Sequence, residues 1–273
     1  MKKLARIALF LTLFAVFAAA LSGCKNTGGT GSESGGVKTI AVGTGTSYKP
    51  YCYLDDDGNL AGYEYEVLKA VDKLLPQYEF KFETFDFKNI LLSIDSGKID
   101  IGAHQFEENP DRVKNYLFGE EAYTTFIRYI TVDKGRSDIK SIDDLGGKHV
   151  YAAPGDNATY FFQAWNEEHK DKPMILDVVE GVTTEELLAG LKSKKWDAYS
   201  ATKRDVAQAN EQYGDSVKTV GEPHINSNTY FVFKKGNTEL QEAVDGAVKE
   251  LKSNGELAQL SIGIIGSDYT ENE

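Results

Sequence analysis

The sequence predicts an α/β body made of two lobes, with the chain crossing between them twice. Predicted strands alternate with predicted helices, which indicates crossover units and a mostly parallel sheet. The alternation starts again near Ser141, and the chain ends in a further strand and helix over residues 228–253. A body of this kind closes over a ligand by hinge motion.

The first half holds five predicted elements. The strand at Lys38–Gly43 is rich in β-branched residues, and the helix at Glu64–Leu75 has apolar residues at helical spacing and ends before Pro76. The others are a strand at Tyr78–Glu83, a helix at Phe87–Ser96 and a strand at Ile99–Ala103, with a turn at Asp55–Asn59 between two extended segments.

The second half repeats the pattern. Asp156 or Asn157 is expected to cap a helix that runs to about Lys170. The other elements are helices at Ser141–Leu145, Thr184–Ser193, Lys203–Tyr213 and Thr238–Ser253, and strands at His149–Ala152, Ile175–Val179, Ala198–Ala201 and Asn228–Phe233. We expect lobe 1 to comprise residues 37–132 and 222–273, and lobe 2 residues 133–221.

The N-terminus has the build of a secretory signal, with early cations followed by the apolar run Ile7–Leu21. That run is shorter than the roughly 20 residues that span a bilayer. Leu21-Ser22-Gly23-Cys24 resembles a bacterial lipobox, which implies a leader at residues 1–23 and lipid on Cys24. Residues 24–36, rich in glycine and serine, are expected to form a flexible tether. The protein would then be anchored on the extracytoplasmic face of the cell membrane; the alternative is an ordinary cleaved signal with a chance cysteine.

Composition excludes several classes of function. The net charge is −12, so the chain lacks the basic character that nucleic-acid binding requires. With Cys24 lipidated, Cys52 is the remaining thiol and no intrachain disulfide can form; we expect it to be a quiet, partly buried thiol, and the alternative is a reactive role. The four histidines lack the spacing of metal ligands, and the chain has no Walker loop, dinucleotide fingerprint or nucleophile elbow. We therefore predict no metal, no cofactor and no catalytic residue.

Six motifs, in order along the mature chain, resemble those of the polar amino-acid-binding lipoproteins of bacterial ABC importers, solute-binding family 3. They are Ser47–Tyr51, Gly62–Val67, Phe87–Leu91 with Ser96–Asp100, Pro110–Arg112 with Leu117–Phe118, Ser141–Lys148 and Leu251–Leu257. The resemblance implies a periplasmic-binding-protein-like (type II) fold with a ligand cleft between its lobes and two hinge crossings.

The resemblance also implies how charged groups of the ligand are held. Arg112 would grip a ligand carboxylate with a two-pronged fork; the alternative is an exposed salt bridge with Asp111 or Glu108. Asp156, Asn157 and Ala158 stand where the family presents backbone N–H groups from a helix start.

Aromatic residues occupy the family's stacking positions. Tyr48, Tyr51 and Phe87 would stack on the ligand and exclude water, although Tyr51 could instead pack within lobe 1.

The sequence departs from the family pattern in two places. Thr202 stands where the family often has an aspartate that pairs with the ligand ammonium, and Glu107 stands in the place of a serine. Our hypothesis is that Glu107 supplies the missing negative charge; the alternative is a solvated Glu107 on a loop. Together with Gln105 and His104, this segment resembles the branch that binds cystine and related sulfur amino acids.

The predicted function is capture of a polar amino acid, with cystine or a related sulfur amino acid as a candidate, by a receptor that delivers it to an ABC permease and its ATPase. A monomer is expected. One alternative is an extracellular sensing subunit with the same pocket. The other is a dehydratase-like enzyme on the same fold, for which Glu107 would need a partner that the sequence does not reveal.

Overall fold

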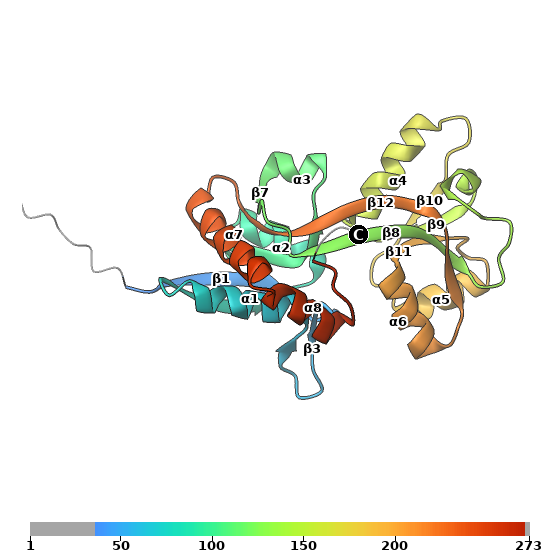
Figure 1. The fold of residues 1–273 in the computed structure, drawn as a ribbon. Helices are drawn as coiled ribbons and strands as arrows, with labels where there is room; N and C mark the ends of the chain where they lie inside the picture. The colour runs from blue at the N-terminus through green and yellow to red at the C-terminus, as the bar shows by residue number, and fades with distance from the viewer. Residues whose placement is uncertain (1–35, 271–273) are drawn as a thin grey trace, which may run out of the picture. The chain divides into compact units, whose positions relative to one another are not determined.

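A computed structural model describes residues 36–270 (Figure 1). The predicted leader, the lipidation site at Cys24 and residues 24–35 of the tether lie outside the described residues. Within the described part, no helix is both long enough and apolar enough to cross a membrane.

The central sheet has seven strands and mixed direction. Its order is β11 (Tyr199–Thr202), β8 (Thr124–Asp133), β12 (Val217–Lys234), β6 (Ile101–Glu107), β1 (Lys38–Thr44) and β5 (Tyr78–Thr84), and β7 (Tyr116–Phe118) also pairs with β12. The pairs β1–β5 and β1–β6 are parallel, whereas β8 and β12 run antiparallel to each other and β12 runs antiparallel to β6. The prediction of a mostly parallel sheet is therefore wrong, because the chain goes out along β8 and returns along β12.

Two small sheets lie outside this path. Strands β9 (His149–Ala152) and β10 (Ile175–Val178) form a parallel pair. Strands β2 (Ser47–Tyr48), β3 (Cys52–Leu54) and β4 (Leu60–Ala61) form an antiparallel sheet, and the turn at Asp55–Asn59 connects β3 to β4 as predicted.

Most predicted helices are confirmed to within two residues. The helices are α1 (Tyr63–Leu74), α2 (Phe87–Asp95), α3 (Pro110–Asn115), the 3₁₀ helix η1 (Ile142–Leu145), α4 (Asn157–Glu168), α5 (Thr184–Lys192), α6 (Lys203–Tyr213), α7 (Thr238–Ser253) and α8 (Glu256–Ile265). The sequence interpretation did not include β7, β8, α3 or α8, and it assigned only the last third of β12 to a strand.

Two sets of core residues establish two lobes. One set packs β1, β5 and β6 against α1, α2, α7 and α8, and the other packs β9 against α4, α5 and α6. Along β8, Phe126 belongs to the first core and Ile130 to the second; along β12, Phe231 belongs to the first and Ile225 to the second. Strands β8 and β12 therefore connect the lobes, as Figure 1 shows, and the predicted two-lobe α/β fold with two crossings is confirmed. The residue limits of the lobes stay a prediction.

Candidate functional site

Arg112 joins the two lobes through backbone carbonyls. Asn109 caps α3 by accepting a hydrogen bond from the Arg112 N–H at 2.9 Å, which fixes the start of that helix. The Arg112 guanidinium then donates through Nη1 to the Glu107 carbonyl at 2.8 Å and through Nη2 to the Gly155 carbonyl at 2.6 Å. Two of its five N–H donors are thus used on protein carbonyls, and the remaining donors are available to an acceptor.

The surroundings of Arg112 are aromatic. Its guanidinium carbon lies 5.3 Å from the centre of the Phe106 ring and 5.8 Å from that of Phe87. Burial lowers the pKa of Arg112 from its usual value, and 7% of the residue is exposed. Asp111 and Glu108 are not among its ion-pair partners in the described residues, so the alternative of an exposed salt bridge does not hold.

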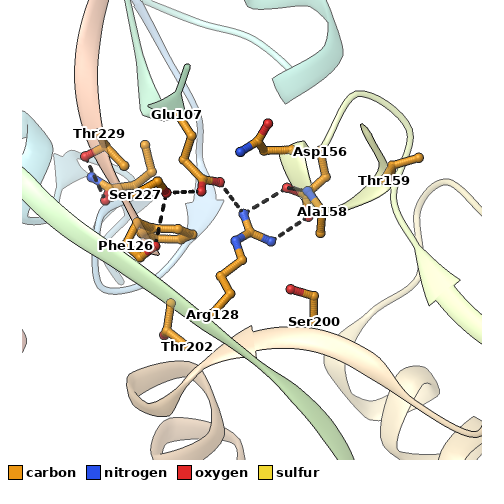
Figure 2. A network of polar contacts seen from close by, with 12 residues as sticks. Glu107, Phe126, Arg128, Asp156, Ala158, Thr159, Ser200, Thr202, Ser227 and Thr229 are labelled. Carbon is orange, nitrogen blue, oxygen red and sulfur yellow. Dashed lines mark hydrogen bonds and ion pairs between the residues drawn. The ribbon is translucent and has the colours of Figure 1, made fainter. Parts of the chain in front are cut away.

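Arg128 is the centre of a buried ion-pair network that the sequence interpretation missed. From the middle of β8 its Nη2 reaches the carboxylate of Glu107 at 2.9 Å and that of Asp156 at 2.8 Å, and its Nη1 makes a second bond to Asp156 at 2.9 Å (Figure 2). Burial by itself would lower the pKa of Arg128, but the two carboxylates outweigh burial and raise it. A lone arginine in a strand of β-branched and aromatic residues was the available sequence signal.

Asp156 serves two purposes at the start of α4. As predicted, it is the N-cap, and its side chain accepts a hydrogen bond from the Ala158 N–H at 3.4 Å. Burial acts to raise its pKa, but the charge and hydrogen bonds of Arg128 outweigh that effect and the pKa is lowered, so Asp156 is an anion. The neighbouring Asn157 accepts a hydrogen bond from the Asn109 amide at 3.1 Å, a further contact between the lobes.

Glu107 is not solvated. It is 1% exposed at the end of β6, and its carboxylate accepts hydrogen bonds from Arg128 and from the Ser227 hydroxyl. Arg112 and Arg128 thus face Glu107 and Asp156, a set with matched positive and negative charge. Such a set suits a zwitterion, since each charged end of the ligand meets an opposite charge.

Thr202 has a local role. It is the N-cap of α6, and its hydroxyl donates to the Asp205 carboxylate at 2.7 Å while accepting from the Asp205 N–H. The acid at this end of the second lobe is therefore Asp205, three residues beyond the predicted position. The capping-box spacing Thr-x-x-Asp was the signal that could have identified it.

Aromatic rings line the first-lobe side of the site. Tyr48 stacks on His104 with ring centres 5.5 Å apart, and Phe87 lies 4.8 Å from the same imidazole. Burial lowers the pKa of His104 to about 4, so this ring is neutral. A Cβ atom on Gly45 would lie 2.5 Å from that imidazole, which explains why the loop after β1 has glycine there. Tyr51 lies deeper, fully buried in the first-lobe core with its ring 4.9 Å from that of Tyr48.

Gln105 is held in an unusual backbone conformation next to a buried acid. Its φ is +50°, and its N–H donates to the Glu64 carboxylate at 2.8 Å. Burial raises the pKa of Glu64 to about 7. Cys52 is fully buried beside Glu64, more deeply than the partly buried thiol that the sequence predicted, and burial raises the pKa of its thiol.

Several buried donors around these residues have no hydrogen-bond partner in the described structure. They are Tyr51 Oη, Gln105 Nε2, Arg128 Nε and Arg204 Nη1. An unpaired buried polar group costs about 1–3 kcal/mol, and two of these donors belong to the arginines that contact the Phe126 ring, so a ligand that brings acceptors would satisfy them. Carboxylate oxygens are such acceptors.

The described residues contain no group of three or more histidine, cysteine, aspartate or glutamate side chains placed to hold a metal ion. The arrangement they do contain, paired charges beside aromatic rings, is one that binds and orients a small polar molecule.

Comparison with known proteins gives consistent matches. A model of the bacterial extracellular solute-binding proteins, family 3, matches residues 40–266. The chain is 36% identical over 271 residues to the L-cystine-binding protein TcyK of Bacillus subtilis, covering 99% of this chain and 98% of that protein. It also resembles the structure of a putative L-cystine ABC transporter from Listeria monocytogenes, with TM-score 0.78, 36% identity and coverage of 86% and 99%. A Streptococcus mutans structure connected with glutathione import via GshT and the cystine ABC importer TcyBC matches with TM-score 0.77, 26% identity and coverage of 86% and 98%.

Proposed function

Because the chain belongs to family 3 of the bacterial extracellular solute-binding proteins, we propose that it captures an amino acid, with L-cystine as the first candidate, and delivers it to an ABC importer. Cystine is favoured because relatives that match nearly the whole chain are named for binding it. The relatives are solute-binding proteins, and the proposed mechanism likewise makes and breaks no covalent bond.

The observation that carries this proposal is the charge arrangement between the lobes. Arg112, with donors free on its guanidinium, is proposed to hold the ligand carboxylate, assisted by Arg128 Nε. Glu107 and Asp156 supply the negative charge for the ligand ammonium, and so replace the aspartate that the family often has at the position of Thr202.

The other proposed ligand contacts surround these charges. The rings of Tyr48 and Phe87 form a face on which a ligand side chain can pack, and Gln105 offers an amide donor. We propose that the Tyr51 hydroxyl donates a hydrogen bond to the ligand, and that Asn157 and Ala158 help ligand binding by positioning the start of α4.

Closure is proposed to follow from contacts that exist only when the lobes meet. The Arg112 bond to Gly155, the Asn109 bond to Asn157 and the Arg128 bridge between Glu107 and Asp156 all connect elements on either side of the junction. A ligand that binds more tightly to this arrangement than to an open one shifts the population toward it. The closed, loaded form is the species offered to the permease.

The location of the protein is part of the same proposal. Lipid on Cys24 and a tether over residues 24–36 would hold a monomeric two-lobe body on the extracytoplasmic face of the membrane. We propose that the hinge lies on β8 between Phe126 and Ile130 and on β12 between Ile225 and Phe231, because each strand passes from one core to the other there, a few residues from the predicted lobe limits.

The test is a thermal-shift screen of the full-length protein with the twenty amino acids, L-cystine, L-cystathionine, glutathione and cystamine. A ligand at 100 times its Kd adds about 2.7 kcal/mol of stability to the folded state. We expect L-cystine to raise the unfolding midpoint. Cystamine, which is cystine without its carboxylates, should leave the midpoint unchanged because it offers nothing to the arginines. No shift with any of the amino acids would overturn the proposal.

A further inference from the structure

Arg204 extends from the second lobe into the first. It lies in the first turn of α6, and its Nη2 donates to the Thr125 carbonyl on β8 at 2.9 Å. Its guanidinium carbon is 4.1 Å from the centre of the Tyr269 ring and 5.5 Å from that of Tyr51. These contacts hold the planar group between aromatic rings that belong to the other lobe.

Two buried donors at this place have no acceptor. Arg204 Nη1 and Tyr51 Oη are both buried without a hydrogen-bond partner in the described residues, and Tyr51 is fully buried. Burial raises the pKa of Tyr51, so its hydroxyl remains a donor at neutral pH. A purely structural contact between the lobes would account for the Nη2 bond and the ring contacts, but it would leave both of these buried donors without an acceptor, which is unfavourable.

Arg204 lies close to the candidate site around Arg128, because both arginines contact the ring of Phe126. The guanidinium carbon of Arg128 lies 4.7 Å from the centre of the Phe126 ring, and that of Arg204 lies 5.8 Å from the same centre. The two arginines are therefore at most 10.5 Å apart, the sum of those distances. Phe126 and Arg128 are two residues apart on β8 and point to the same face of the sheet.

Asp205 gives this second position its own negative charge. Its carboxylate accepts a hydrogen bond from the Thr202 hydroxyl, and its negative charge contributes to raising the pKa of Tyr48 and of Tyr51. Arg204 and Asp205, adjacent in the first turn of α6, thus bring one positive and one negative charge close to Phe126, whose ring Arg128 also contacts.

We propose that Arg204 and Tyr51 bind the second carboxylate of a two-headed amino acid whose first carboxylate lies at Arg112 and Arg128, with Asp205 facing the second ammonium. This inference rests on the proposed function and adds to it the residues that hold the second head of the ligand, which would consist of two amino-acid ends joined by a short apolar chain that passes Phe126. A disulfide-linked bis-amino acid such as cystine has this form.

The experiment compares two ligands in four proteins. Dissociation constants for L-cystine, which has two heads, and for S-methyl-L-cysteine, which has one, are measured by isothermal titration calorimetry with the wild type, Tyr51→Phe, Arg204→Gln and Lys203→Gln. Tyr51→Phe removes only an unpaired hydroxyl and so preserves the packing of the core. Lys203→Gln removes an exposed positive charge from the adjacent position of α6 and is the control.

We expect the Tyr51 and Arg204 variants to lose at least fivefold and tenfold, respectively, in affinity for cystine and to keep their affinity for S-methylcysteine within twofold. Lys203→Gln should change neither. Equal losses for both ligands would show that Arg204 and Tyr51 act only on lobe closure and would overturn the inference, as would cystine affinity unchanged in both variants. If the wild type binds neither ligand, the proposal of cystine as the ligand fails and the inference fails with it, which is a result distinct from either of these.

Discussion

Replacing Arg112 by lysine tests the site while keeping its charge. The guanidinium donates to carbonyls at 2.8 Å and 2.6 Å on either side of the lobe junction and has further donors for a carboxylate. A lysine ammonium is a point charge on a flexible stem and cannot make these contacts together. Loss of one charge-assisted bond should weaken amino-acid binding by about 1.5–3 kcal/mol, or roughly 10- to 150-fold in Kd.

The assay is isothermal titration calorimetry of L-cystine against the wild type, Arg112→Lys and Arg136→Lys. Arg136 is a matched control because it also makes forked contacts, to Asp138 at 2.7 Å and Asp197 at 2.7 Å, outside the candidate site. Its replacement should lower stability and leave affinity within twofold. An Arg112→Lys protein that binds cystine within threefold of the wild type would refute the role assigned to Arg112.

Three further predictions concern stability and location. Burial raises the folded-state pKa of Glu64 from 4.5 to about 7, so between these values the folded protein holds a proton that the unfolded chain has lost, and stability falls as the pH rises. In denaturant titrations, the stability of Glu64→Gln relative to the wild type should therefore rise by up to about 3 kcal/mol from pH 5 to pH 8. A difference that does not change with pH would contradict this. Thr202→Val removes the cap of α6 and should cost about 1 kcal/mol, or about 2–4 °C in Tm, measured by thermal unfolding, and an unchanged Tm would contradict the capping role. Cys24→Ala should remove the site of lipid attachment, so cells given radiolabelled palmitate should label the wild type and not the variant, and a wild type without label would argue against a lipid anchor.

Local signals in the sequence predicted most of the helices. The apolar spacing of α7 and the cap at Asp156 depend on residues close together in the chain, and the structure places both as expected. Strand β8 was missed although it is rich in threonine, isoleucine and aromatic residues, and its pairing with β12 over distant positions makes the sheet mixed. Sheet direction depends on which strands become neighbours, and that is set by the path of the whole chain.

For the candidate site, the sequence indicated the residue types but not their partners. Arg112, Glu107 and Asp156 were selected from motifs, whereas Arg128 was not, because its partners lie 21 residues before it and 28 residues after it. Asp205 was likewise not predicted, because the family pattern has the acid at the position of Thr202, three residues earlier. Such contacts come from the meeting of two lobes, which no local pattern records.

The most direct test of the central claim is a calorimetric titration of the full-length protein with L-cystine, repeated with cystamine. The account predicts saturable binding of one cystine per chain and no heat of binding with cystamine, since the paired arginines recognise carboxylates. Absence of cystine binding, or equal binding of cystamine, would contradict the claim that this charged junction is an amino-acid site.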